Sequence, residues 1–205
     1  MDQAAKRNYF EELASVWDQL PRPHDSAVRL RGFLEEALPP RPLRVLDVGC
    51  GTGILLEGLL ELCPRETRIV ELDFAWNMLA VNASLYRDPR VFRVCADAHA
   101  LPFPPGLFDA VLCFNALPHL GEMSRALDSL LAMLAPGGAL AVGHWMSSEE
   151  LNAFHAGLDG PVSQDRLPAV NELAAEIGRA GLEVVCAEEE PGWYFLLATK
   201  ASGGA

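Results

Sequence analysis

Residues 45–53 read VLDVGCGTG, and the helix-forming stretch ILLEGLL follows at residues 54–60. The apolar run ends on the carboxylate of Asp47 and then turns through three closely spaced glycines. Glycine allows the positive φ angles and the close backbone approach that such a turn requires. The pattern predicts a β-strand, a tight turn and a helix, with the turn at the carboxyl end of the strand, where open α/β sheets bind ligands.

The spacing of the glycines separates two kinds of cofactor site. A dinucleotide-binding fingerprint has the spacing G-x-G-x-x-G, whereas here the third glycine arrives one residue early and Ile54 takes its place. The turn also lacks the Lys-Ser/Thr ending of a phosphate-binding P-loop. The spacing therefore disfavours a nucleotide-dependent oxidoreductase.

Strand and helix patterns alternate along the chain. The pattern predicts strands at 43–48, 68–73, 91–95, 108–114, 138–145, 182–188 and 193–199. It predicts helices at 3–19, 25–38, 53–62, 75–86, 122–134, 148–157 and 168–180. Such alternation favours right-handed crossovers and a doubly wound parallel sheet with helices on both faces. The last two strands flank the turn Glu190-Pro191-Gly192, so we expect a seven-stranded α/β sheet, mostly parallel, with an antiparallel C-terminal hairpin strand.

Proline-rich stretches separate the N-terminal part of the chain from the rest. The sequence PRP at 21–23 divides the first two predicted helices, and PPRP at 39–42 ends the second one before the first strand. We therefore expect an N-terminal helical cover over residues 1–40 and one α/β domain over residues 41–200. The small, polar residues 201–205 are expected to be disordered.

Composition limits the class of partner. Half of the 205 residues are hydrophobic, which is enough for one buried core. The formal net charge of −12 argues against nucleic acid or an anionic membrane surface as a partner. The N-terminus does not resemble a signal peptide, and no apolar stretch approaches the roughly 20 residues that span a bilayer. Five scattered cysteines without a C-x-x-C motif are typical of a cytoplasmic protein, and Cys95 and Cys113 are expected to be buried in strands.

Further motifs follow the glycine turn in order. They are ELD at 71–73, DAHALPF at 97–103 and LAPGG at 134–138. Together with residues 45–53 they resemble the motifs of the class I S-adenosylmethionine-dependent methyltransferases, most of all the ubiquinone/menaquinone-biosynthesis type (methyltransferase type 11). The stretch FEELASVWD at 10–18 resembles the N-terminal helix that closes over the cofactor in that family. The resemblance implies a Rossmann-like fold and transfer of a methyl group from S-adenosylmethionine to a small-molecule acceptor by in-line displacement.

The resemblance also implies which residues hold the cofactor. Asp73 would accept hydrogen bonds from both ribose hydroxyls, and Asp97 would accept one from the adenine amino group while the Ala98 N–H donates to a ring nitrogen. The alternative role for Asp73 is to cap the helix predicted at 75–86. Glu71 stands where the family often has glycine. The expected cofactor-binding residues are Asp47, Gly49, Cys50, Gly51, Gly53, Asp73, Phe74, Met78, Asp97, Ala98 and Asn115.

Catalysis of this kind needs little acid–base chemistry. In-line positioning supplies much of the rate, and a base helps only where the acceptor must lose a proton. His119, after the fourth strand, and His144, at the end of the fifth, are the candidate catalytic residues, because both lie at the ligand-binding edge of the sheet. A histidine packed in a loop for structural reasons is the alternative for His119.

The segment after the fifth strand is rich in polar groups that can bind a metal or a substrate. Two histidines and a carboxylate can ligate a metal ion. The spacing matches no established ligand motif, so we expect no metal site and favour a polar acceptor pocket. The residues concerned are His144, Asn152, His155 and Asp165.

The motifs are compatible with two classes of function. The first is an active methyltransferase for a small neutral or cationic acceptor, in view of the charge of the chain. The second is a catalytically inactive S-adenosylmethionine-binding module that serves as a regulatory or partner subunit, since fold alone does not guarantee activity. The acceptor atom, and whether the chain forms a homodimer, are left open by the motifs.

Overall fold

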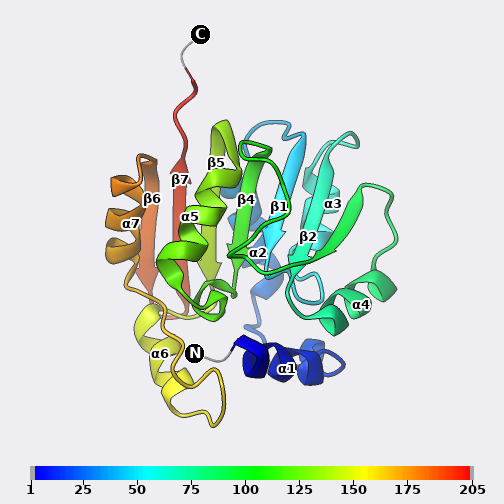
Figure 1. Cartoon of the computed structure of the whole chain (residues 1–205), viewed down its shortest axis with the longest axis vertical. Coiled ribbons are helices and arrows are strands. Elements are labelled where there is room, and N and C mark those ends of the chain that lie inside the picture. Colours follow the sequence, from blue (N-terminus) through cyan, green and yellow to red (C-terminus); the bar gives the residue numbers. More distant parts are fainter. Residues whose placement is uncertain (1–2, 204–205) are drawn as a thin grey trace.

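The computed structural model describes residues 3–203, which fold around one seven-stranded sheet of strand order β3-β2-β1-β4-β5-β7-β6 (Figure 1). Strands β1 to β5 pair in parallel, whereas β7 lies antiparallel between β5 and β6. The expected fold class is therefore confirmed. The strands are β1 (Arg44–Val48), β2 (Arg68–Asp73), β3 (Val91–Cys95), β4 (Phe108–Phe114), β5 (Leu134–His144), β6 (Glu183–Glu190) and β7 (Trp193–Thr199).

Helices lie on both faces of the sheet and across one edge (Figure 1). In the view of Figure 1, α5 lies in front of the sheet, α2 and α3 lie behind it, and α1 crosses below the ends of the central strands. The helices are α1 (Gln3–Leu13), α2 (Ser26–Ala37), α3 (Leu56–Leu62), α4 (Trp76–Leu85), α5 (Met123–Met133), α6 (Ser148–Ala156) and α7 (Val170–Arg179), with short 3-10 helices η1 (Trp17–Gln19) and η2 (Leu117–Leu120).

Two hydrophobic clusters fix the sheet between its helices. Val45 and Leu46 are neighbours in β1, and both are fully buried. Because successive strand residues point to opposite faces, Val45 packs in the cluster of α2 and α3, and Leu46 in the cluster of α5 and α7. Burial on both faces explains why the central strands read as continuous apolar runs without alternation.

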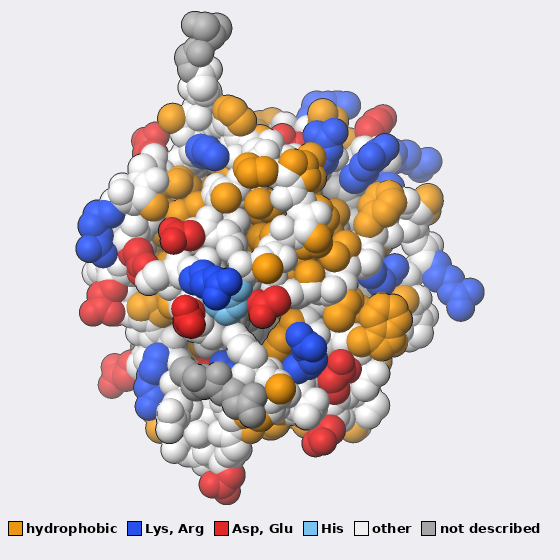
Figure 2. Space-filling view, viewed as in Figure 1, with side chains coloured by type: hydrophobic (Ala, Val, Ile, Leu, Met, Phe, Trp, Pro, Cys, Tyr) orange, Lys and Arg blue, Asp and Glu red, His pale blue; other side chains and the backbone are white. Residues whose placement is uncertain are grey.

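Residues 96–107, which connect β3 to β4, form turns and bends instead of a helix. Leu101, Phe103 and Leu107 of this segment pack, partly buried, against the cluster of α5 and α7. Figure 2 shows hydrophobic side chains gathered on this front face. Asp97 and Ala98 come two and three residues after the end of β3, which pairs with β2, and they therefore lie at the carboxyl edge of the sheet, where the expected ligand site lies.

Some expectations from the sequence need correction. The helix predicted at 3–19 is divided into α1 and η1, and the helix predicted at 53–62 begins only at Leu56, because Gly53 has a φ of 97° and extends the turn. Cys113 is buried as predicted, but the prediction for Cys95 was wrong: it is exposed, because β3 is an edge strand. Of the tail expected to be disordered, residues 204–205 lie outside the described residues. Within residues 3–203, no helix is long and apolar enough to cross a membrane.

The packing of β5 against α2 leads to a stability prediction. A Cβ added at Gly143 would lie 2.7 Å from Phe114 Cδ2 and 2.8 Å from Phe33 Cε2. Gly143→Ala should therefore lower the free energy of unfolding, measured in urea, by about 1–3 kcal/mol. The matched control is Gly178 in α7, where an added Cβ meets nothing within 4 Å, so Gly178→Ala should raise that free energy by about 0.5–1 kcal/mol. Equal stability of the two variants would contradict this packing.

Candidate active site

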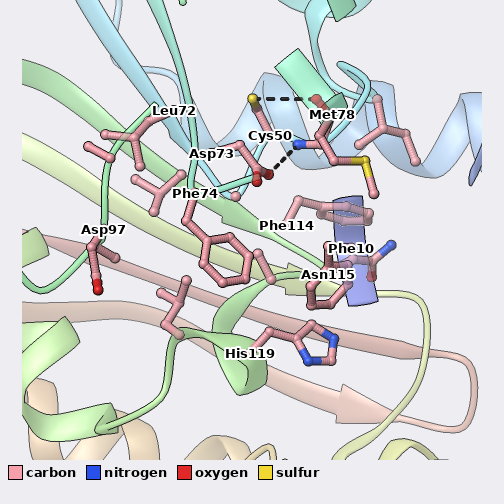
Figure 3. Close-up of a pocket in the computed structure, with 18 of the residues that line it drawn as sticks. Phe10, Cys50, Leu72, Asp73, Phe74, Met78, Asp97, Phe114, Asn115 and His119 are labelled. Atoms are coloured by element: carbon pink, nitrogen blue, oxygen red, sulfur yellow. Dashed lines mark hydrogen bonds between the residues drawn. The ribbon is translucent and has the colours of Figure 1, made fainter. Parts of the chain in front are cut away.

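A pocket lies at the carboxyl ends of β1, β2 and β4, below the glycine turn and against α1 (Figure 3). It holds about 800 Å³ of empty space, part of it open to solvent. Of the residues expected from the sequence, Asp47, Gly53 and His144 do not line it. Those that do are Gly49, Cys50, Gly51, Asp73, Phe74, Met78, Asp97, Ala98, Asn115 and His119.

The glycine turn is held tightly against both neighbouring strands. The N–H groups of Gly49 and Cys50 donate to Leu72 O at 2.8 and 3.1 Å, which ties the turn to β2. Gly49 has a φ of 69°, and a Cβ there would lie 2.4 Å from Ala116 Cβ, just after β4. Only glycine fits this position, so the turn forms the floor of the pocket with its backbone exposed to a ligand.

Asp73, at the end of β2, lies with both carboxylate oxygens at the pocket. Oδ2 accepts a hydrogen bond from Gly51 N at 3.0 Å, and Oδ1 accepts one from Ala75 N at 2.8 Å. Burial raises the pKa of Asp73 to about 6, against the effect of these backbone donors. Because each oxygen has two lone pairs, each keeps room for one more donor.

The alternative role for Asp73, capping α4, falls to another residue. Ala75 is the N-cap residue of α4 and has no side-chain cap. Instead, Glu11 of α1 accepts hydrogen bonds from Trp76 N at 2.8 Å and Asn77 N at 2.6 Å. No local sequence pattern indicates this contact, which joins residues 65 positions apart. Glu11 thus ties α1 to α4 and leaves the outer lone pairs of Asp73 to a ligand.

Asp97 and Ala98 lie at the other side of the pocket (Figure 3). Asp97 Oδ1 accepts a hydrogen bond from His99 N at 2.9 Å and lies 2.7 Å from His99 Nδ1. Burial opposes the ionisation of Asp97, but these hydrogen bonds outweigh it and hold its pKa below the usual value. An ionised Asp97 is a hydrogen-bond acceptor only, as an adenine amino group would require.

Two further acids lie buried behind the turn. Asp47 and Glu71 face each other in the register of β1 and β2, and both are at most 1% exposed. Burial raises the pKa of Glu71 to about 7 and that of Asp47 well above its usual value. Glu71 accepts a hydrogen bond from Asn82 Nδ2 at 2.8 Å, and a Cβ at Gly53 would lie 2.7 Å from that same nitrogen. Glu71 and Gly53 therefore pack around Asn82 behind the turn, and Asp47 lies buried beside Glu71.

Asn115 and His119 line the pocket after β4, whereas His144 lies outside it. Asn115 has a φ of 53°, which asparagine tolerates, and its Oδ1 accepts a hydrogen bond from Trp145 N at 3.1 Å. His144 is 7% exposed, its Nδ1 accepts a hydrogen bond from Met146 N at 3.1 Å, and burial lowers its pKa to about 3. With Nδ1 occupied and the ring neutral, the geometry favours His119 as the histidine that meets a substrate.

Two of the residues considered for a metal site, Asn152 and His155, hold the loop 157–169 in place instead. Asn152 exchanges two hydrogen bonds of 2.9 Å with the backbone of Leu167, and His155 Nδ1 donates to Asp165 O at 3.1 Å. Within residues 3–203, no group of three or more His, Cys, Asp or Glu side chains is arranged to hold a metal ion.

Besides Glu11, a second candidate residue was missed in the sequence. Lys6 of α1 is 1% exposed, and its Nζ lies 2.6 Å from Asp165 Oδ1. The only signal was its position four residues before Phe10, on the face of α1 that packs inward.

Comparison with known proteins agrees with this site. A family model described as a methyltransferase domain matches residues 46–142. The demethylmenaquinone methyltransferase of Thermus thermophilus is 38% identical over 138 residues, which cover 65% of this chain and 62% of the relative. A malonyl-[acyl-carrier protein] O-methyltransferase of Halorhodospira halophila is 36% identical over 146 residues, covering 68% of this chain and 48% of the relative. The chain thus spans less than two thirds of the length of these relatives.

A solved structure shows the same fold. The S-adenosylmethionine-dependent methyltransferase of Aquifex aeolicus superposes with a TM-score of 0.68 at 20% identity, covering 91% of this chain and 97% of the other. The motifs, the strand order, the family model and the relatives all agree. Residues 46–142 match the methyltransferase domain family, and the chain is similar to methyltransferases of the ubiquinone/menaquinone-biosynthesis type.

Proposed function

We propose that this protein binds S-adenosylmethionine in the pocket below α1 and methylates a small aromatic acceptor that carries a hydroxyl group. The observation that carries the proposal is Asp73: a buried carboxylate at the end of β2, with one free acceptor position on each oxygen. This arrangement suits the pair of hydroxyls on a ribose. The choice of a hydroxylated aromatic ring as the methyl acceptor is supported by the names of the relatives and by the aromatic side chains that line the pocket, which are described below.

The residues present fit the cofactor. The backbone at Gly49–Gly51 lines the pocket, and a Cβ at Gly51 would lie 3.7 Å from Trp17 Nε1 and 4.0 Å from Met78 Sδ, two other side chains that line it. Asp73 would hold the ribose, Asp97 and Ala98 the adenine edge, and Met78, buried beside the turn, would pack on the adenine ring. When bound, S-adenosylmethionine supplies a methyl group activated by a positively charged sulfur.

The acceptor side of the pocket is apolar and aromatic. Phe10 lies edge-on to Phe74 and to the His119 ring, with ring centroids 5.8 and 5.1 Å apart, and Phe114 lines the pocket from β4. Aromatic walls favour a planar apolar ring and exclude water from the site. A relative named for demethylmenaquinone points to the same class, so we take a reduced naphthoquinone ring as the acceptor to test.

The protein would contribute to methyl transfer by positioning the cofactor and the acceptor relative to each other. The turn and Asp73 fix one reactant, and the aromatic wall orients the other, which makes methyl transfer effectively unimolecular. Helix α1 packs against this side through Phe10 and is tied to α4 through Glu11.

Two measurements test the proposal. Calorimetry should show binding of S-adenosylmethionine and S-adenosylhomocysteine but not of NAD. Mass spectrometry should show methylation of dihydroxynaphthalene, kept reduced, when S-adenosylmethionine is present. Binding of the cofactor without methylation of this acceptor or of other hydroxylated rings would favour the inactive binding module, and binding of NAD alone would contradict the proposal.

Asp73 should make cofactor affinity depend on pH. Because burial raises its pKa to about 6, the carboxylate is protonated below that pH and loses acceptor capacity. Affinity for S-adenosylhomocysteine should be constant above about pH 7 and fall as the pH drops below about 6. Asp73→Asn should cost about 1.5–3 kcal/mol of binding and remove this dependence. Calorimetry from pH 5 to 8 measures this affinity. The control is Asp128→Asn on the exposed face of α5, which should keep the pH dependence of the parent protein. If Asp73→Asn also keeps that pH dependence, Asp73 does not bind the cofactor.

The contact between α1 and α4 should matter for retention of the cofactor. Glu11→Gln keeps the size of the side chain but removes the charge that caps α4, worth about 1 kcal/mol, so affinity for S-adenosylhomocysteine should fall about fivefold. The neighbouring Glu12 is exposed on the same helix, and Glu12→Gln should leave affinity unchanged. If both variants bind as tightly as the parent protein, α1 does not close the site through this contact.

A further inference from the structure

Three side chains from distant parts of the chain meet beside the pocket. Lys6 comes from α1, His119 from η2, and Asp165 from the loop between α6 and α7. The Asp165 carboxylate bridges the other two: Oδ1 lies 2.6 Å from Lys6 Nζ, and Oδ2 lies 2.7 Å from His119 Nδ1. The side chains of Lys6 and Asp165 are 1% and 0% exposed. A buried arrangement of this kind costs desolvation energy, so a role beyond stability is worth seeking.

The carboxylate determines which nitrogen of His119 carries the proton. An ionised carboxylate can only accept hydrogen bonds, so Nδ1 of His119 must be the protonated nitrogen. In the neutral ring Nε2 is then unprotonated and can accept a proton. Within residues 3–203, Nε2 of His119 has no hydrogen-bond partner, and the ring lines the pocket (Figure 3).

Lys6 keeps this carboxylate ionised although it is buried. Burial alone would raise the pKa of Asp165, but the hydrogen bonds from His119 and Lys6 outweigh it and hold that pKa below its usual value. The neighbouring rings of His144 and His155 add no charge, since burial lowers the pKa of both. Lys6 also donates to His119 O at 3.4 Å, so it contacts both other members of the group.

We propose that His119 accepts a proton from the methyl acceptor through Nε2 and that Asp165 positions the His119 ring. Lys6, from the helix α1 that packs against the pocket, pairs with Asp165 and keeps its carboxylate ionised. The inference rests on the proposed function and narrows its substrate class. The acceptor is a compound whose hydroxyl or activated ring carbon must lose a proton, and not a thioether or tertiary amine, which would need no base.

The step balances as follows in atoms and electrons. The proton of the acceptor passes to Nε2 of His119, and the electron pair left on the acceptor forms the bond to the methyl carbon. The carbon–sulfur bond breaks with its electron pair on sulfur, which turns the sulfonium into a neutral thioether. The imidazolium that remains is stabilised by Asp165 and returns its proton to water.

Nuclear magnetic resonance of the histidine ring nitrogens tests the geometry without any acceptor. The chain has only five histidines, so each signal can be assigned from a single substitution. In the parent protein, loaded with S-adenosylhomocysteine, His119 should be protonated at Nδ1 and unprotonated at Nε2. Replacing both charges at once, with Lys6→Met and Asp165→Asn, avoids an unpaired buried charge and should abolish that preference. A parent protein with His119 protonated at Nε2 near neutral pH would overturn the proposal.

Kinetics with dihydroxynaphthalene and S-adenosylmethionine test the chemistry. His119→Ala should lower kcat about a hundredfold, and the double variant Lys6→Met with Asp165→Asn at least tenfold, with KM for the acceptor and calorimetric affinity for S-adenosylmethionine within about twofold. Added imidazole should restore part of the turnover of His119→Gly, which a purely structural role would not allow. The controls are His24→Gln, an exposed histidine, and Lys200→Met, the only other lysine of the chain; both should behave as the parent protein.

The outcomes separate the two proposals. Parent-level kcat in His119→Ala, or in the double variant Lys6→Met with Asp165→Asn, would overturn the role of His119 as a base and leave the proposed function intact. If the parent protein binds S-adenosylmethionine but does not methylate dihydroxynaphthalene, the acceptor class of the proposed function fails, and the protonation state of His119 by nuclear magnetic resonance alone decides the inference.

Discussion

The contact of the glycine turn after β1 with the neighbouring strands β2 and β4 determines how the residues that line the pocket are arranged. Gly49 and Cys50 donate to Leu72 O on one side, and on the other side Gly49 lies so close to Ala116 that no Cβ fits between them. The ends of β1, β2 and β4 are thereby drawn together at the point where the strand order reverses. Since Asp73 and Asn115 follow directly from these strand ends, their positions depend on that one close approach.

The protein buries carboxylates in two physically different ways. Asp47 and Glu71 lie behind the turn without a directly bonded lysine or arginine, and burial raises the pKa of both, so protonation is the means by which their charge is reduced. Asp165 is equally buried but paired with Lys6 and His119, which favours its ionised form. The first arrangement supports a backbone turn, whereas the second provides a fixed negative charge beside a histidine that faces the pocket.

Much of the fold could be predicted because its signals are local. Apolar runs bounded by Gly and Pro marked the strands, and Pro191-Gly192 marked the hairpin that places β7 antiparallel beside β5. The glycine turn and Asp73 could be expected to line the pocket, because both lie at the ends of strands that local patterns predict. Glu11 and Lys6 could not be predicted, because their contacts join residues 65 and 159 positions apart that no local pattern records. Asp165 was considered from the sequence only as a ligand for a metal or a substrate, and its pairing with Lys6 was not predicted. His144 shows the converse: its position at the end of a strand suggested the pocket, but the bend at Met146 turns its Nδ1 to the backbone.

The central claim is that Asp73 and the glycine turn hold the adenosine part of the cofactor with its sulfur toward His119. A crystal structure of the protein with S-adenosylhomocysteine tests it most directly. The account predicts one ribose hydroxyl on each oxygen of Asp73 at about 2.6–2.8 Å and the sulfur on the side of the pocket lined by His119. A ligand whose ribose makes no contact with Asp73, or whose sulfur faces away from His119, would contradict it.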